Sequence, residues 1–486
     1  MYIDVMKLFR VGIMVCVKIL IATWGKPWMN SEGCSPRDIR WDEVEYVYEN
    51  HRVRSRSSLS LLLDVFRPVT TFLVVLDTVI DANYSFSKYE ELEDCVSTLY
   101  REFVKNYIYY PDNMNTRDLR VVVAPGSGIF LRQKLIIESH LRNFFSVAFA
   151  KLVLGVVDVL RDHQGELEII LDTTHALNYM PALVYDALEK ICSILAYAYD
   201  VRFKVVNAEP YEKGISKLRI HIVKEEETVP LISRCPPIKG NFNPFKIHTS
   251  IIDDSSSTLG KSLAEEYSRI ANDMGFGKWR DLIEHFMCLK GSLVNGFPLA
   301  LHKFYIDPEE IRSKVIEPLI SLFYKHFKIR QLGNKLVIRN PLIFTQLFDE
   351  IVECYLIASI LRNLGVDKKD EVGLDELKRT NNSIFRRYGA HRVRIGRDLK
   401  EIEDTVSDYI KQKPLREWIV FAEIYREVKK DVGEGFDVRN FLAHSGFEKN
   451  SIEVVVRDGI PRIRYRSDMT DVIKNAIIET CTTIMN

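Results

Sequence analysis

The chain lacks several signatures that would indicate a function directly. Its 67 Lys and Arg residues equal its 67 Asp and Glu residues, so no overall basic charge marks a nucleic-acid-binding protein. Any contact with RNA must then come from a local patch. The eight cysteines are scattered, with no CxxC pair and no Cys/His spacing typical of zinc. We therefore expect reduced, mostly buried thiols, as in an intracellular protein.

Long apolar runs are also missing. The run at residues 11–17 is short, is flanked by Arg10 and Lys18, and has no small-residue cleavage site after it. A membrane span needs about 20 consecutive apolar residues, and a signal peptide needs that cleavage site. We therefore expect a cytoplasmic protein without a membrane segment, and we treat residues 1–14 as an N-terminal extension.

Two common nucleotide-binding motifs are absent as well. No Rossmann GxGxxG follows a predicted strand, and Gly260-Lys261-Ser262 is not a Walker loop because Ser255 stands where its first glycine belongs. The Gly126-Ser127-Gly128 turn also lacks the Gly-Lys-Ser/Thr that a Walker loop requires. Any nucleotide site must therefore be of another kind.

Alternating apolar strands and amphipathic helices fill residues 15–225. Continuous apolar runs predict strands, and segments of 3.6-residue period between them predict helices. The predicted strands lie at 15–22, 41–48, 66–76, 119–124, 167–171, 201–207 and 218–224, and the helices at 86–108, 135–163 and 182–199. This βαβ series indicates a doubly wound, Rossmann-like α/β domain.

Polar and glycine-rich residues follow three of the predicted strands. Open α/β sheets bind ligands at the carboxyl ends of their strands, so these loops would converge on one rim. Ordinary alternatives remain open: Trp24 as a core residue, the glycines as a tight turn, and His175 as a cap or core histidine. The candidate ligand-binding residues are Thr23, Trp24, Gly25, Gly126, Ser127, Gly128, Asp172, Thr173, Thr174, His175 and Asn178.

The composition changes after residue 225. Residues 226–260 are rich in proline and serine and are expected to be a linker. Residues 261–486 have mainly helical periodicity and form a second domain. We expect two hairpins in it, at 328–339 and 452–465, and a final helix from Asp471.

A local basic cluster lies in this helical region. Arg386, Arg387, Arg392 and Arg394 are interleaved with Phe385 and Tyr388. Such a cluster is a candidate surface for an RNA backbone. A solvated charged face, paired with nearby acids, is an equally good interpretation.

Residues 437–446 hold the strongest candidate for catalysis. Arg439 and Asn440 are followed by three apolar residues and His444, with Gly433 and Gly435 before the run and Ser445-Gly446 after it. Arginine suits a phosphate, and histidine exchanges protons near neutral pH. On an ideal helix Asn440 and His444 share a face, whereas Arg439 points away. Arg439 must then reach round, or the helix is irregular, or a second copy supplies the partner. Taken alone, the pattern also fits a surface arginine beside a core histidine.

Two longer strings resemble known families. Arg-Asn-x-x-x-His, with Ala443 before the histidine, resembles the signature of HEPN-domain ribonucleases. Asp-Thr-Thr-His-x-x-Asn-Tyr-Met-Pro at 172–181, together with the Thr-Trp-Gly that ends the first strand, resembles CARF sensor domains. In this order the two are similar to the CARF–HEPN accessory ribonucleases (Csx/Csm) of type III CRISPR systems. The resemblance covers nearly the whole chain from Lys18, with a CARF domain at 15–225 and a HEPN domain at 261–486.

The resemblance implies a function in antiviral defence. A cyclic oligoadenylate, with the tetra-adenylate favoured, would bind across a CARF dimer and activate metal-independent cleavage of single-stranded RNA. The 2′-OH of the RNA would attack at a composite HEPN site, with His444 as acid or base, Arg439 stabilising phosphate charge and Asn440 orienting it. No cofactor or metal is implied, and assembly beyond a homodimer is left open. The alternative is a ligand-sensing, nucleic-acid-binding transcription regulator without catalysis, although no clear helix-turn-helix follows residue 261.

Overall fold

The chain folds into two compact units in a computed structural model that describes residues 16–108, 118–161, 163, 165–232, 242–251, 256–429, 433 and 435–482. The first, the sheet unit, comprises Met1–Thr228, Asn243–Leu263 and Ile316–Val352. The second, the helical unit, comprises Val229–Phe242, Ala264–Val315 and Glu353–Asn486. The predicted N-terminal extension at 1–14 and parts of the predicted linker lie outside the described residues.

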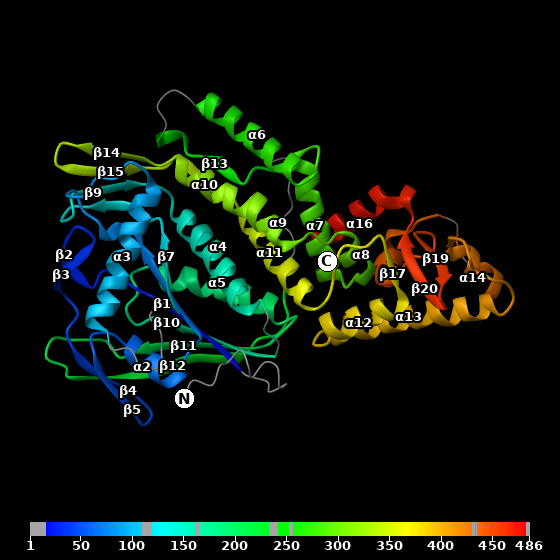
Figure 1. Ribbon diagram of the computed structural model, residues 1–486, viewed down its shortest axis with the longest axis horizontal. Coiled ribbons are helices and arrows are strands. Elements are labelled where there is room, and N and C mark those ends of the chain that lie inside the picture. Colours follow the sequence, from blue (N-terminus) through cyan, green and yellow to red (C-terminus); the bar gives the residue numbers. More distant parts are fainter. Residues whose placement is uncertain are drawn as a thin grey trace. The chain divides into compact units, whose positions relative to one another are not determined.

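An eight-stranded sheet forms the centre of the sheet unit, in the order β5-β4-β12-β11-β10-β1-β6-β7 (Figure 1). The five strands from β11 to β7 run parallel, β12 is antiparallel to β11, and β5 is antiparallel to β4. The strands are β1 (Val17–Thr23), β4 (Val44–Tyr48), β5 (His51–Ser55), β6 (Thr70–Leu76), β7 (Leu119–Ala124), β10 (Glu166–Asp172), β11 (Asp200–Ala208) and β12 (Lys217–Glu227). All of β6 is buried, as expected of a parallel strand covered on both faces.

Helices follow the strands as the βαβ pattern predicts. They are α2 (Leu59–Phe66), α3 (Tyr89–Tyr107), α4 (Leu141–Leu160) and α5 (Met180–Leu195). Helices α3 and α4 pack on β7, and α5 packs on β1 and β11. Gly155 lets α4 approach the sheet, because a Cβ there would lie 2.4 Å from Cε1 of Phe72. Within the described residues, one helix, α4, is long and apolar enough to cross a membrane. However, 72% of its most apolar stretch is buried inside the protein, which suits a core helix.

Smaller sheets complete the sheet unit. The order β14-β15-β9-β8 joins two hairpins that are distant in sequence (Figure 1). They are formed by β8 (Gly128–Phe130), β9 (Leu135–Glu138), β14 (Lys328–Leu332) and β15 (Lys335–Arg339). The remaining elements are β2 (Trp28–Glu32), β3 (Ser35–Ile39), β13 (Phe245–Ile247), β16 (Leu342–Phe344) and α10 (Glu317–Lys325). The predicted 328–339 hairpin is therefore present, but it pairs with β9 of the sheet unit.

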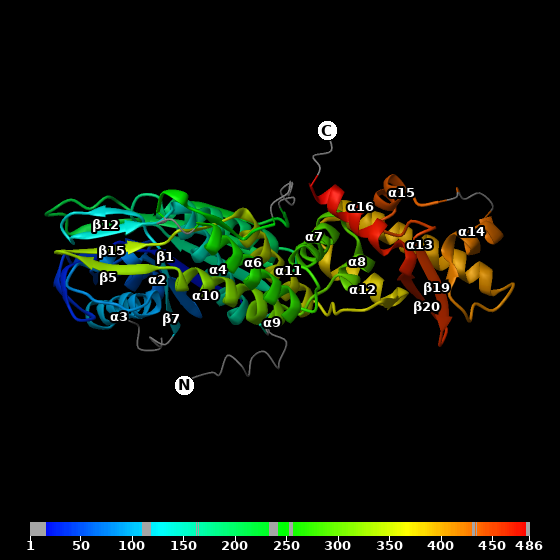
Figure 2. The ribbon, with the colours of Figure 1, turned by 90° about the horizontal axis from the view of Figure 1, so that it is seen from above.

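The helical unit contains a four-stranded sheet among its helices. Strands β17 (Glu371–Gly373), β20 (Ile460–Tyr465), β19 (Ile452–Arg457) and β18 (Ile419–Val420) pair in that order. Figure 2 shows β19 and β20 beside α13 and α14. The helices are α7 (Trp279–Asn295), α8 (Pro298–Lys303), α9 (Pro308–Ile311), α12 (Leu374–Ile384), α13 (Gly389–Ile410), α14 (Phe421–Lys429), α15 (Val438–Ala443) and α16 (Thr470–Thr482). Two more, α6 (Ser256–Asp273) and α11 (Gln346–Asn363), contribute residues to both units.

Several local predictions were wrong. Residues 28–39 hold the β2–β3 hairpin, and residues 51–66 hold β5 and α2, although no strand or helix was predicted between 49 and 65 or between 23 and 40. The helix predicted from 135 begins at Leu141, because β9 occupies 135–138. Cys34 and Cys95 form a disulfide, so the expectation of reduced thiols does not hold for this pair. None of the other described cysteines is in a disulfide.

Candidate functional site

The Arg439–His444 segment forms the short helix that the sequence predicts. Asp437 caps it, since its side chain accepts a hydrogen bond from the backbone N–H of Asn440 (2.8 Å). The helix ends at Ala443, and the N–H of His444 just after it donates to the carbonyl of Asn440 (2.9 Å). Ser445 and Gly446 then adopt left-handed φ values of 53° and 81°. A Cβ on Gly446 would also lie 2.9 Å from the Tyr465 hydroxyl, so glycine is required there.

The imidazole of His444 is held by a buried aspartate. Nδ1 lies 3.4 Å from Oδ1 of Asp398, a residue of α13 that is only 3% exposed. The other carboxylate oxygen accepts a hydrogen bond from the Ser445 hydroxyl (2.8 Å). A carboxylate beside Nδ1 favours a proton on that nitrogen and assigns proton exchange to Nε2. The His444 side chain is 36% exposed, so a substrate can reach it.

A half-buried arginine completes this cluster. Arg394 donates from Nε to the Ser445 hydroxyl (3.1 Å) and also donates to the carbonyl of Asn295. Burial lowers the pKa of its guanidinium. His391, stacked on Tyr388, has its pKa lowered to about 4 by burial. We call Arg394, Asp398, His444 and Ser445 the His444 cluster. The predicted basic patch is therefore divided: Arg394 contacts Ser445 beside His444, Arg387 is half-buried, and Arg386 and Arg392 are exposed.

The structure does not join the other two residues of the motif to this cluster. Arg439 and Asn440 are both exposed on α15. Within the described part of the chain, their side chains make no hydrogen bond or ion pair, and none links Arg439 to His444. Both side chains are therefore available to a ligand or to a second copy of the chain.

Two groups of side chains could hold a metal ion. Asp398, Glu401 and His444 offer ligand atoms within 4.8 Å of one another, as do His302, Asp367 and Glu376. In the first group, Lys449 lies 3.5 Å from Glu401 and Arg397 lies 3.7 Å from Asp398. These cations already neutralise the acids and would repel a metal ion.

In the second group, both ring nitrogens of His302 already have partners. Nδ1 lies 3.0 Å from the carbonyl of Asp367 and Nε2 lies 3.2 Å from the hydroxyl of Thr380. Neither group therefore offers a preformed metal centre.

In the sheet unit, two of the three predicted loops meet at the centre of the sheet. Strand order reverses beside β1, where β10 pairs with it in parallel, and this is the usual ligand position in open α/β sheets. The Thr23 hydroxyl donates to the carbonyl of Asp172 (3.3 Å), and the N–H of Gly25 donates to that of His175 (2.8 Å). A Cβ on Gly25 would lie 2.7 Å from Cγ of Leu177. The loops after β1 and β10 are thus in direct contact.

The most polar residues of these loops point into the protein. Asp172 is 1% exposed, accepts hydrogen bonds from the Ser58 hydroxyl (2.7 Å) and the Thr174 N–H (3.0 Å), and has its pKa raised by burial. His175 stacks on Trp41 (ring centroids 4.0 Å apart), and Nε2 lies 3.4 Å from both the Ser58 N–H and the Tyr46 hydroxyl. Burial lowers the pKa of His175 to about 3, so the ring is neutral. Both residues fix the start of α2.

Other members of the same loops differ in exposure. Thr23 and Trp24 are fully buried, whereas Asn178 is exposed, with φ at 47°. The hydroxyl of Thr173 donates to the carbonyl of Val206 (3.2 Å), and that of Thr174 accepts from the N–H of Ala208 (3.0 Å). The surface that a ligand could touch is therefore smaller than the predicted set of residues.

The third loop, at 126–128, lies at the end of β7 and faces the end of β6. The N–H of Gly126 donates to the buried carboxylate of Asp77 (2.7 Å), and a Cβ on Gly126 would lie 2.4 Å from Thr78. The Ser127 hydroxyl donates to the carbonyl of Ser139 (2.8 Å). Gly128, with φ at 141°, begins strand β8. The β8–β9 hairpin follows this turn, so no helix N-terminus lies directly after it, and a role of these residues in ligand binding stays a prediction.

The sequence analysis missed Asp398 and Ser445. Asp398 lies four residues after Arg394 on α13, so the two share a helix face. This spacing is a local signal, and the predicted basic patch ended just before the aspartate. The contact with His444, 46 residues away, has no local signal.

Two family models match the chain. Residues 19–210 match the CARF domain of CRISPR system endoribonuclease Csx1, and residues 388–467 match the HEPN domain of the same protein. The chain is also 28% identical over 443 residues to the CRISPR system endoribonuclease Csx1 of Methanocaldococcus jannaschii. The aligned region covers 90% of this chain and 87% of that protein. The HEPN match includes Asp398, Arg439 and His444, and the CARF match includes every predicted rim residue.

The fold and these matches define a Rossmann-like ligand-sensing domain followed by a helical nuclease domain with small strands. The chain belongs to the CARF–HEPN family of CRISPR-associated ribonucleases.

Proposed function

We propose that the protein cleaves single-stranded RNA without a metal ion and is activated by a cyclic oligoadenylate, with the tetra-adenylate as the first candidate. The observation that carries this proposal is the His444 cluster, in which a buried aspartate holds a half-exposed imidazole. The helix that precedes this histidine, α15, also presents the exposed Arg439. RNA carries its own nucleophile, so acid–base chemistry and charge stabilisation suffice for its cleavage.

The reaction follows from these groups. The 2′-oxygen of RNA attacks the adjacent phosphorus while its proton passes to a base, and the bond from phosphorus to the 5′-oxygen breaks as that oxygen receives a proton. The products are a 2′,3′-cyclic phosphate and a 5′-hydroxyl. Nε2 of His444 is placed to take or give one of these protons, and Arg439 would stabilise the charge on the phosphate oxygens. Asn440, exposed on the same helix, would orient the phosphate.

A homodimer would supply what one chain lacks. One His444 handles one proton at a time, whereas cleavage needs a base and an acid. A two-fold axis near α15 would bring a second His444 and a second Arg439 to the same phosphate. The exposure of Arg439 and Asn440 is compatible with such an arrangement. Coupling between the sensing domain and this dimeric site would make cleavage depend on the ligand.

Independence from metal is supported by charge. The acids nearest His444 face Arg397 and Lys449, as described above, and the carboxylate of Asp398 is hydrogen-bonded to Ser445. A divalent ion would have to displace these partners.

The activator would bind at the carboxyl ends of β1 and β10. The groups that fit it are Thr173, Thr174, Leu177 and Asn178, with the neighbouring cation Lys26, whose pKa is lowered mainly by burial. A partly desolvated lysine suits a phosphate. Asp172 and His175 would act by holding this loop rather than by touching the ligand.

The test is cleavage of a labelled single-stranded RNA in EDTA, with and without cyclic tetra-adenylate. We expect ligand-dependent cleavage by the wild type and a loss of about 100- to 10,000-fold in His444→Ala. His221→Ala, on an exposed histidine of β12, is the matched control and should keep full activity. If no ring of three to six adenylates stimulates cleavage, the transcription-regulator hypothesis takes the place of this proposal.

A further inference from the structure

One face of the β14–β15 hairpin carries a cluster of cations. Side chains alternate across a strand, and Lys328 pairs with Arg339, Arg330 with Val337 and Leu332 with Lys335. All six side chains therefore lie on one face of the hairpin. On the other face, Leu336 and Ile338 are buried. We call the face with Lys328, Arg330, Lys335 and Arg339 the hairpin face.

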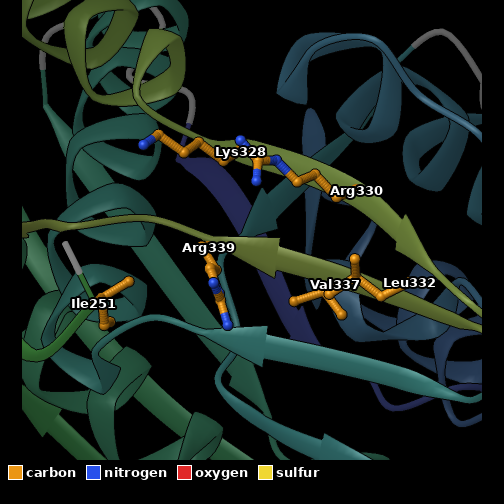
Figure 3. A pocket seen from close by; sticks show the side chains of 6 residues that line it. All are labelled: Ile251, Lys328, Arg330, Leu332, Val337 and Arg339. Carbon is orange, nitrogen blue, oxygen red and sulfur yellow. The ribbon is translucent and has the colours of Figure 1, made fainter. Parts of the chain in front are cut away.

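A shallow pocket lies on this face. It is lined by Lys328, Arg330, Leu332, Val337 and Arg339, together with Ile251 of the short helix Thr249–Ile251. Figure 3 shows the guanidinium of Arg330 extending along β14 toward Lys328, while Arg339 extends from β15 toward the next strand. Cationic ends thus surround an apolar floor formed by Val337, which is 5% exposed.

The charges on the hairpin face are poorly compensated within the chain. Arg339 pairs with Glu138 of β9 (Nε to Oε2, 2.5 Å). Among the described residues, Lys328, Arg330 and Lys335 make no side-chain hydrogen bond or ion pair. Lys328 even stands directly opposite Arg339 in the antiparallel ladder, an arrangement in which like charges repel. Because the fold gains nothing from this repulsion, an external anion is the natural counterpart.

The spacing of the cations selects the kind of anion. Alternate residues on a strand are separated by about 6–7 Å, which is near the distance between successive phosphates of an extended nucleic-acid strand. No aromatic side chain lies on the hairpin face to stack a base, so recognition would be limited to the backbone. The chain as a whole has no net charge, which makes a local cluster of unpaired cations distinctive.

We propose that the hairpin face binds the phosphate backbone of single-stranded RNA, independently of sequence, as a second contact besides the His444 cluster. This inference rests on the proposed ribonuclease function for its choice of RNA as the partner. It assigns to Lys328, Arg330 and Lys335 a role in holding substrate and none in the chemical step.

The test compares two variants with the same loss of charge, both made in the His444→Ala background so that RNA is not cut. The first is Lys328→Gln/Arg330→Gln/Lys335→Gln. The control is Arg52→Gln/Lys213→Gln/Lys217→Gln, which removes one arginine and two lysines from exposed positions elsewhere in the sheet unit. Binding of a fluorescent 20-nucleotide RNA is measured by anisotropy over a range of KCl, and oligomeric state by sedimentation.

We expect the hairpin variant to bind at least tenfold more weakly than the control at low salt. Its slope of log affinity against log salt should fall by about 2, since each lost phosphate contact removes roughly 0.7 from the slope for a single strand. Equal affinity and slope in the two variants would overturn the proposal. So would a changed oligomeric state with unchanged RNA affinity, which would assign the face to contact between copies of the chain. Because binding is read without activator or cleavage, it can succeed even if the proposed activation fails.

Discussion

The two candidate sites use the same residue types in opposite ways. At the rim of the sheet unit, Asp172 is buried and His175 is half-buried, and both have hydrogen-bond partners inside the protein and hold a loop to α2. In the helical unit, Asp398 is equally buried, but the histidine that it holds is 36% exposed. Burial converts the first histidine into a structural residue, with its pKa near 3. Exposure on one side leaves the second free to exchange a proton with a substrate. The surroundings of the imidazole, rather than residue type, separate the two.

The largest expected effect tests whether the His444 site needs two chains. We expect Arg439→Ala and His444→Ala each to lose about 100-fold or more of the cleavage rate. When the two inactive variants are co-expressed with different tags and the mixed dimer is purified, one intact Arg439 and one intact His444 remain at a shared site. Part of the activity should therefore return, to a rate above that of either parent dimer, as measured by RNA cleavage.

A mixed dimer as inactive as its parents would contradict the composite site and place Arg439 and His444 of one chain on the same phosphate. The control is a mixed dimer of two differently tagged wild-type chains, which shows that tagging and exchange preserve activity. Because Arg439 is exposed and makes no described contact, its loss should leave the melting temperature unchanged.

A smaller effect separates the two buried aspartates. Asp398→Asn should lower cleavage by about 10- to 100-fold, because an amide can present a donor to Nδ1 of His444 and disfavour the required tautomer. Asp172→Asn, with no contact to His444, should spare the maximal rate at saturating activator. Both changes remove a charged acceptor from a buried hydroxyl, so each should reduce stability by roughly 1–3 kcal/mol. The measurements are cleavage rate and thermal melting of each variant.

The contrast fails if Asp172→Asn lowers the maximal rate as much as Asp398→Asn does. In that case the rim aspartate would contribute to activation itself, and its burial would be a property of the ligand-free form only. Ser445→Ala is the matched variant within the His444 cluster, since it removes one hydrogen bond to Asp398 and keeps the carboxylate.

The sequence predicts the buried sheet well and its periphery poorly. Strands such as β7 and β10 are continuous apolar runs between helices, and their pattern alone locates them. The β2–β3 and β8–β9 hairpins are short and partly polar, so no periodicity distinguishes them from loops. Arg439, Asn440 and His444 are close in sequence and carry their own signal. The contact of His444 with Asp398 depends on the packing of α13 against α15, which local pattern does not encode.

The smallest expected effect concerns Asp77, a second buried carboxylate near the rim. Burial raises its pKa to about 7, although the Gly126 N–H and the Tyr89 hydroxyl (3.0 Å) donate to it. The folded protein therefore keeps a proton that the unfolded chain releases near pH 4. The stability that this bound proton contributes is fully present below pH 4 and is lost as the pH rises through about 7. In Asp77→Asn the side chain is neutral throughout and can still accept from Gly126. We expect the difference in melting temperature between wild type and variant to shift in favour of the variant between pH 4 and 8. The opposite titration of His175 is common to both proteins and cancels in that difference.

Parallel melting curves across this range would mean that Asp77 is ionised in the folded protein at all these pH values. The 126–128 turn would then be held by a charged acceptor, unlike the neutral loop around His175.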